Sequence, residues 1–265
     1  MAQTGDLIAG RQPVGEALAA GVPITEILVA EGAHAQLDGI ISTATDRGIA
    51  VRRVPRHRLD RLADGVVHQG VVALSAPYRY AALGDILAGS LSSSGGPVLV
   101  ADGVTDPRNL GSLIRVADAA GAAGLVIPER RASGVTVGAR KSSAGAAEHV
   151  AIARVPNLTR AVEEAKSAGV WVIGLDDAAT ATIYDVDLAG PIALVVGAEG
   201  KGISRLVKEN CDLVTRIPMH GRVSSLNVAQ AAAVALFEWR RRRQEPEGGS
   251  SSGPACSSAG GPRKG

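Results

Sequence analysis

Ile217-Pro218-Met219-His220-Gly221, followed by Ser224-Ser225-Leu226-Asn227, is the most informative stretch of this sequence. It lies between an apolar run typical of a strand, residues 213–217, and a predicted apolar helix over residues 226–243. Ser225 is predicted to cap that helix, which places Asn227 in the first turn with its amide able to face a ligand. Because ligands of open α/β sheets bind at the carboxyl ends of strands, this stretch predicts one wall of a binding site.

Two loops upstream lie in the same setting, at the end of an apolar run. The first holds Asn109, with Arg115 six residues further along a predicted helix, so one helix could direct both toward the same end of the sheet. Arginine offers a fixed fork of donors for phosphate. The second loop is Gly197-Ala198-Glu199-Gly200-Lys201-Gly202, whose glycines permit tight turns and close backbone approach to a ligand. It matches neither GxxxxGK[ST] nor GxGxxG, so we expect the three loops to form a composite site of another kind.

Strand-like and helix-like segments alternate along the sequence, which predicts an α/β protein whose larger part is a mostly parallel sheet with helices on both faces. Six short runs are hydrophobic almost throughout, as are strands buried on both faces: residues 98–101, 125–127, 150–155, 170–175, 192–196 and 213–217. Helical segments are predicted between them, at residues 110–120, 137–147, 158–168, 203–210 and 226–243.

We expect four regions along the chain. Residues 1–78 alternate short helical and strand patterns and form a small N-terminal α/β domain. Residues 79–96 end in Ser92-Ser93-Ser94-Gly95-Gly96, a composition typical of a flexible linker, with at most a short helix over residues 82–88. Residues 97–243 form the larger domain. Residues 244–265 are rich in Gly, Ser and Pro with almost no apolar content, which predicts a disordered tail.

Composition argues against several classes of protein. The two cysteines, Cys211 and Cys256, form no CxxC pair, and the five histidines show no HExxH or other paired spacing. We therefore expect no metal site and no disulfide framework. No run approaches the roughly 18 apolar residues of a membrane span, and the N-terminus lacks a long apolar stretch. We expect no membrane association, and the cytoplasm is the default location.

The formal charge of +2 hides an uneven distribution. Residues 240–265 hold six basic residues against two acidic ones, a net charge of +4, so the rest of the chain carries −2. RNA binding by the body of the protein would therefore depend on local patches. One patch contains Asp60 and six arginines: Arg47, Arg52, Arg53, Arg56, Arg58 and Arg61. It is either a solvated face or a phosphate-binding surface, and the predominance of arginine over lysine keeps the second interpretation open.

Taken together, the three loops resemble the SpoU branch of the knotted, TrmH-like RNA methyltransferases. The residues that carry this resemblance are Asp106-Pro107-x-Asn109-x-Gly111-x-x-x-Arg115, Gly197-x-Glu199-Gly200-x-Gly202 and Ile217-Pro218-Met219-x-Gly221 through Ser225-Leu226-Asn227-Val228. Near the N-terminus, Gly10-Arg11-x-x-Val14-x-Glu16-Ala17-Leu18 and His68-Gln69-Gly70-Val71 are similar to the family's substrate-binding module, a small fold also found in ribosomal proteins. The arrangement is most similar to the 23S ribosomal RNA guanosine 2′-O-methyltransferases.

The resemblance implies a SPOUT-type trefoil knot in the C-terminal half and a homodimer, with an S-adenosylmethionine site inside the knot. It implies cofactor contacts for six residues: Gly197, Ile217, Leu226, Leu175, Ala198 and Met219. It further implies that Arg115 is catalytic and completes a site beside the partner subunit's cofactor. Asn109, Glu199 and Asn227 would orient Arg115, ribose and cofactor, and Ser225 would hold the last loop.

The implied reaction is transfer of a methyl group to a ribose 2′-hydroxyl of ribosomal RNA. Arg11 and the arginines Arg47, Arg52, Arg53, Arg56 and Arg58 are the candidates for gripping that RNA. Transfer RNA and an antibiotic-binding ribosomal loop are alternative targets. A catalytically silent RNA-binding protein and a nucleotide-dependent oxidoreductase are the alternatives of another class, and the missing GxGxxG disfavours the latter.

Overall fold

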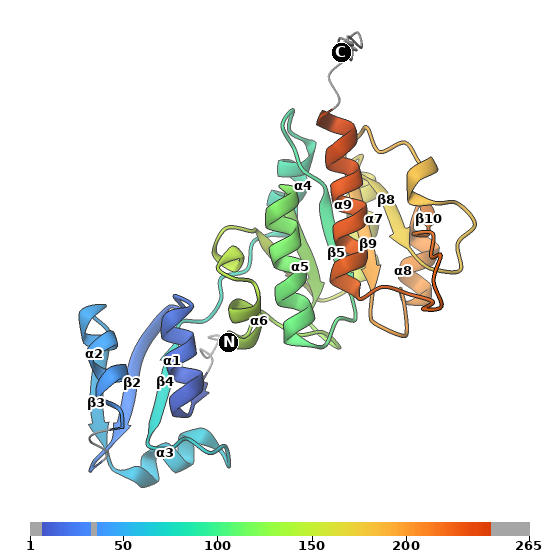
Figure 1. Cartoon of the computed structure of the whole chain (residues 1–265). Coiled ribbons are helices and arrows are strands. Elements are labelled where there is room, and N and C mark those ends of the chain that lie inside the picture. Colours follow the sequence, from blue (N-terminus) through green and yellow to red (C-terminus); the bar gives the residue numbers. More distant parts are fainter. Residues whose placement is uncertain (1–6, 33–35, 245–265) are drawn as a thin grey trace, which may run out of the picture.

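Six strands form the larger sheet of the computed structural model, which describes residues 7–32 and 36–244 (Figure 1). The strand order is β10-β8-β9-β5-β6-β7, and each neighbouring pair is parallel. The strands are β5 (Val98–Asp102), β6 (Gly124–Pro128), β7 (Ile152–Val155), β8 (Trp171–Leu175), β9 (Ile192–Gly197) and β10 (Leu213–Thr215). All six lie on the predicted apolar runs, because a strand covered on both faces has no polar side to interrupt its hydrophobicity.

Two apolar cores hold helices against the two faces of this sheet. One core contains residues of α5 (Pro107–Ala120), α6 (Val137–Ser142) and α9 (Val228–Gln244), and the other contains residues of α4 (Leu83–Leu91), α7 (Leu158–Ser167) and α8 (Arg205–Asn210). Successive strand residues point to opposite faces, so Leu99 belongs to the first core and Val98 to the second. The predicted α/β class, with a parallel sheet between two layers of helices, is confirmed.

Local signals explain where the helices beside the site begin and end. Asp106 caps α5 by accepting a hydrogen bond from the Arg108 N–H at 2.8 Å, and Pro107 takes the first turn, where its missing N–H costs nothing. Helix α6 ends at Ser142, earlier than the predicted residue 147, because Ala144 and Gly145 adopt positive φ angles of 52° and 93°. Two short 3₁₀ turns, η1 (Ala146–Glu148) and η2 (Ile183–Asp185), complete the unit.

The smaller N-terminal unit has a four-stranded sheet in the order β1-β4-β2-β3. Its elements are β1 (Leu7–Ala9), α1 (Arg11–Ala19), β2 (Ile24–Ala30), α2 (Asp38–Asp46), β3 (Ala50–Val54), α3 (Arg56–Ala63) and β4 (Val71–Ser75). β2 pairs parallel with β3, and β4 pairs antiparallel with both β1 and β2. β1 was not predicted, because three residues are too few to display a hydrophobic period.

The segment predicted as a flexible linker, residues 79–96, packs against the larger unit for most of its length, and the helix predicted within it over residues 82–88 is present as α4. Ile86 and Leu87 of α4 are buried in the second core of the larger sheet. Before this helix, the Ala81 N–H donates to the Ile152 carbonyl at 2.8 Å, and Tyr80 accepts a hydrogen bond from the Val135 N–H at 3.0 Å. The serine- and glycine-rich end dominated the prediction, but the apolar residues before it pack as part of the larger unit.

Helix α6 lies between the two units, beside α1 on one side and α5 on the other (Figure 1). The Lys141 ammonium pairs with the Glu16 carboxylate of α1 at 2.5 Å. Val137 packs against the apolar core of the N-terminal unit. No helix within the described residues is long and apolar enough to cross a membrane. The predicted disordered tail, except for Gln244, lies outside the described residues.

Candidate active site

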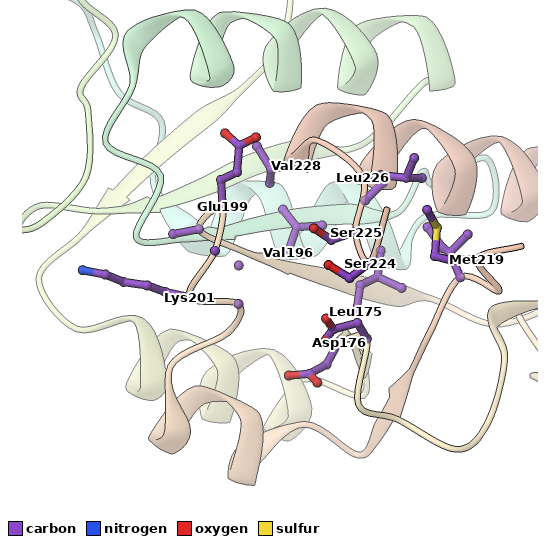
Figure 2. Close-up of a pocket in the computed structure, with 17 residues that line it drawn as sticks. Leu175, Asp176, Val196, Glu199, Lys201, Met219, Ser224, Ser225, Leu226 and Val228 are labelled. Atoms are coloured by element: carbon purple, nitrogen blue, oxygen red, sulfur yellow. The ribbon is translucent and has the colours of Figure 1, made fainter. Parts of the chain in front are cut away.

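A cavity of about 310 Å³ opens where β8 and β9 end, against the loop that precedes α9 (Figure 2). This is the carboxyl edge of the parallel sheet, where the three loops were predicted to meet. All six residues that the resemblance assigned to a cofactor line the cavity: Leu175, Gly197, Ala198, Ile217, Met219 and Leu226. Glu199 and Ser225 line it as well.

The loop after β9 forms a tight turn at the mouth of this cavity. The Ala198 carbonyl accepts hydrogen bonds from the N–H groups of Lys201 and Gly202, at 3.2 and 2.8 Å. A Cβ atom at Gly197 would lie 1.9 Å from the Gly202 carbonyl carbon, so only glycine allows this backbone contact. The Asp102 carboxylate, at the end of neighbouring β5, fixes the far end of the turn by accepting from the Ser204 N–H at 2.7 Å. The glycines of the motif therefore shape a backbone wall of the cavity.

Three polar residues predicted to act in the chemistry form a hydrogen-bonded chain beside the cavity. The Asn227 Nδ2 donates to Asn109 Oδ1 at 3.0 Å, and the Asn109 Nδ2 donates to Glu199 Oε2 at 3.3 Å. These residues are 118 and 90 positions apart in sequence, so the fold alone joins them. The chain connects the α5 N-terminus, the glycine loop and the α9 N-terminus. Only Glu199 of the three lines the cavity itself.

The predicted cap of the last helix is wrong by two residues. α9 begins at Val228, and its cap is Asn227, whose Oδ1 accepts from the Ala229 N–H at 2.9 Å. Ser225 is exposed on the cavity wall and makes no such bond. Serine and asparagine are both good caps, so composition could not choose between them. Asn227 thus has two contacts at once: its oxygen holds the helix, and its amide nitrogen holds Asn109.

Arg115 lies on α5 two turns from Asn109 and does not line the cavity of its own chain. Its side chain is exposed, and within residues 7–32 and 36–244 it has no hydrogen-bond or ion-pair partner. The sequence placed Arg115 and Asn109 on one helix correctly. The structure leaves the Arg115 guanidinium available to groups outside this chain.

Asp176 is a cavity residue that sequence reasoning missed. Its Oδ2 accepts from the Lys208 ammonium of α8 at 2.7 Å, and its Oδ1 accepts from the Ala178 N–H at 3.0 Å. Burial acts to raise the pKa of Asp176, but these two donors outweigh it and hold the pKa below its ordinary value. Figure 2 shows Asp176 beside Leu175, near Ser224. No sequence pattern pointed to this pair, because Asp176 and Lys208 are 32 residues apart and belong to no shared motif.

The candidate RNA-binding arginines do not form one free patch. Arg47 donates to the Leu18 carbonyl, Arg11 to the Gln36 side chain, and Arg52 pairs with Glu26 at 2.6 Å. Arg53 is exposed on the edge strand β3. Arg56 and Arg58 are exposed on α3, and no described residue bonds to either guanidinium. The structure therefore separates arginines that hold the domain together from those that face solvent.

The described residues contain no group of three or more His, Cys, Asp or Glu side chains that could hold a metal ion. The donor set around the cavity is instead one of backbone amides, amide side chains, carboxylates and lysines. Such a set suits an organic ligand that has both apolar and charged parts.

Comparison with known proteins covers both units of the chain. Residues 96–237 match the sequence profile of the SpoU rRNA Methylase family, and residues 7–81 match the profile for RNA 2′-O ribose methyltransferase substrate binding. An uncharacterized tRNA/rRNA methyltransferase of Mycolicibacterium vanbaalenii is 48% identical over 242 residues, which cover 90% of this chain and 77% of the relative. A Bacillus subtilis protein described as a TrmH family tRNA/rRNA methyltransferase is 43% identical over 245 residues, which cover 92% of this chain and 98% of the relative.

Two solved structures share the fold over nearly the whole chain. The SpoU methyltransferase AviRb from Streptomyces viridochromogenes, in complex with AdoMet, has a TM-score of 0.65 at 26% identity and covers 92% of each chain. The AdoMet-bound rRNA methyltransferase from Sinorhizobium meliloti has a TM-score of 0.61 at 28% identity, covering 89% of this chain and 87% of its own.

Proposed function

This chain belongs to the SpoU rRNA Methylase family, and from that premise we propose that it methylates a ribose 2′-hydroxyl of RNA at the cavity described above. The observation that carries the proposal is the convergence of Glu199, Asn109 and Asn227, from three separate loops, at the rim of one cavity. Two relatives of similar fold were crystallised with AdoMet, so S-adenosylmethionine is the methyl donor that we assign to this chain.

The residues of the cavity fit this cofactor. Apolar side chains of Leu175, Ile217 and Leu226 form a surface that suits an adenine ring, and the turn at Gly197 borders it with backbone, because any side chain there would clash with Gly202. Asp176 and Glu199 bring carboxylates to the lining, which suit hydroxyl or ammonium donors. When bound, the cofactor supplies an electrophilic methyl group on a sulfonium.

The protein then has two tasks, which are to align the attacking 2′-oxygen and to give its proton a destination. We assign the first task to Arg115, with Asn109, Glu199 and Asn227 holding the rim in place and Ser225 supporting the last loop. A guanidinium does not lose its proton in proteins, so Arg115 is not a general base. Its planar fork is suited to clamp a phosphate next to the target ribose, and that phosphate or a water takes the proton.

The position of Arg115 outside the cavity of its own chain supports the proposal that the enzyme is a homodimer in which the partner subunit supplies this residue. α5 and α9 lie side by side on one face of the sheet (Figure 1). Phe237 of α9 is 48% exposed, and Val116 of α5 is only partly buried. We propose that this apolar surface forms the dimer contact and brings Arg115 to the partner's cavity.

Further parts of the proposal rest on family likeness. We propose that residues 217–227 close a trefoil knot, a feature that folds otherwise almost never contain. We propose that residues 1–78 bind the substrate and that the RNA is ribosomal, with a 23S guanosine as the first candidate and transfer RNA or an antibiotic-binding ribosomal loop as alternatives. The match of residues 7–81 to a substrate-binding profile supports the first of these statements. Reaction on such RNA would place the enzyme in the cytoplasm.

Calorimetry with S-adenosylmethionine tests the proposed function against a catalytically silent RNA-binding protein. We expect saturable binding by the purified chain, and no binding at millimolar cofactor would contradict the proposal. Mapping of 2′-O-methylation on total RNA, from cells with and without the protein, then identifies the target. A site gained on transfer RNA would replace the ribosomal assignment and leave the chemistry intact.

A further inference from the structure

A polar cluster in the N-terminal unit joins the two motifs Gly10-Arg11 and His68-Gln69-Gly70. Neither motif lines the cavity. The Arg11 backbone N–H donates to Gln69 Oε1 at 3.2 Å, and the Arg11 guanidinium donates to the Gln36 side chain. The Gly10 N–H donates to the Val71 carbonyl at 3.1 Å. The start of α1 and the loop before β4 are therefore held together, although 58 residues separate Arg11 from Gln69.

The loop before β4 is fixed from inside by His68. This side chain is only 4% exposed, its Nε2 lies 2.9 Å from Asp60 Oδ1 of α3, and its Nδ1 accepts from the Gly70 N–H at 3.1 Å. Because Nδ1 accepts, the ring carries its proton on Nε2 and donates it to Asp60. Gln69 follows with a φ of 51°, a left-handed conformation that is unfavourable for a residue with a side chain. The anchored histidine thus holds a strained, exposed glutamine in place.

The loop before β4 carries exposed apolar side chains, and α3, which His68 ties to this loop through Asp60, carries positive charge without a described partner. Val66 and Val67 are 58% and 78% exposed, so two neighbouring valines face solvent in the same loop. Arg58 and Arg61 of α3 are exposed, and no described residue pairs with them. Asp60, the acidic residue between them, is already engaged by His68.

Each of these features suits a different part of an unpaired nucleotide. Arginines bind phosphate, exposed aliphatic side chains cover the face of a base or ribose, and the amide of Gln69 can donate to and accept from a base edge. Proteins read RNA sequence mainly in loops and single strands, because the base edges in the deep groove of a duplex are out of reach.

We propose that residues 66–69, with Gln69 held in place by the Arg11 backbone N–H, form a recognition loop for an unpaired segment of the RNA substrate. This inference rests on the proposed function and deepens it, because it assigns the class of RNA and the residues that read it. Arg58 and Arg61 supply affinity through the phosphates, whereas Gln69 and Val67 supply the preference for unpaired nucleotides.

The test compares binding of labelled single-stranded dodecamers of A, C and U with binding of a twelve-base-pair RNA duplex, by fluorescence anisotropy at one fixed salt concentration. We expect the best-bound dodecamer to bind more tightly than the duplex. Gln69→Asn tolerates the left-handed backbone but shortens the amide, and it should weaken that dodecamer about tenfold while duplex binding stays within about twofold. Val67→Ser, at a largely exposed position, should act in the same direction.

Matched controls are Gln12→Asn, on the first turn of α1, and Leu206→Ser, at an exposed position of the other unit. Both should bind the dodecamer as the wild type does. Unchanged dodecamer binding in Gln69→Asn and Val67→Ser, or equal losses for dodecamer and duplex, would overturn the recognition loop. Calorimetry with S-adenosylmethionine on the same variants keeps the two proposals apart, because failure of cofactor binding in the wild type would overturn the proposed function instead.

Discussion

The side chain of Asn227 both caps a helix and orders the proposed active site. Its oxygen caps α9 and its nitrogen reaches Asn109, which in turn reaches Glu199. A loss of Asn227 therefore acts on the stability of a helix and on the order of the site at once. Ser225, two residues away, was the sequence-based choice for the cap but lies exposed on the cavity wall.

Asn227→Ala should lower the free energy of unfolding by about 0.5–2 kcal/mol, because the first turn of α9 loses its cap. Ser225→Ala should change it by less than about 0.5 kcal/mol, as expected for an exposed side chain without a capping bond. Urea denaturation followed by circular dichroism measures both. Equal losses in the two variants would show that the cap is assigned to the wrong residue.

The turn after β9 requires glycine at position 197. In Gly197→Ala the new methyl group would overlap the backbone of Gly202, so the turn has to open and the cavity wall has to move. We expect affinity for S-adenosylmethionine in calorimetry to fall at least tenfold. Gly190→Ala is the matched control, because nothing lies within 4 Å of its Cβ, its φ is not positive and it does not line the cavity. Wild-type affinity in Gly197→Ala would contradict the assignment of this loop to the cofactor.

The last two turns of α9 are held by charge. Arg241 and Arg242 both donate to the Glu238 carboxylate, and Arg242 also donates to the carbonyl groups of Tyr184 and Val186. The pKa of Glu238 is lowered to about 2. The hydrogen bond from Arg241 is the largest cause, burial opposes it, and the bond from Arg242 lowers the pKa further. The arginine run that follows Trp239 is thus largely structural.

The sign of the pH dependence follows from this lowered pKa. The contribution of Glu238 is present above its ordinary pKa of 4.5 and is lost as the pH falls toward 2. Glu238→Gln should destabilise the protein by roughly 1–2 kcal/mol at pH 7, a value kept low because Arg241 is more than half exposed and solvent screens it. The difference from wild type in urea denaturation should shrink between pH 5 and 2. A constant difference would contradict the assignment, and Glu209→Gln, in an exposed ion pair with Arg205, is the control.

At the scale of the whole molecule, the strands and the cavity could be predicted, but the contacts between distant segments could not. Apolar runs located all six strands of the larger sheet, because burial on both faces leaves a continuous signal. The family resemblance assigned six residues to the cofactor, and all six line one cavity. The pair Asp176–Lys208 and the packing of Ile86 depend on how separate elements meet, and no local pattern encodes either.

The two units also meet through contacts that were not predicted from the sequence. Lys141 and Glu16 join α6 to α1, and α6 packs on α5, whose first turn carries Asn109. Helix α6 therefore links the N-terminal unit to the helix that carries Asn109 at the rim of the cavity. This arrangement fits an enzyme that grips RNA with one unit and modifies it with the other.

The central claim is that this cavity, completed by Arg115, methylates a ribose 2′-hydroxyl. Its most direct test incubates the purified chain with tritium-labelled S-adenosylmethionine and total bacterial RNA, and then separates the alkali-stable dinucleotides that a 2′-O-methyl group leaves. We predict that the label appears in those dinucleotides, that Arg115→Lys lowers the rate about a hundredfold by losing the planar fork, and that Arg108→Lys, at an exposed arginine on the same helix, does not. Label on the bases, or near-full turnover by Arg115→Lys, would contradict it.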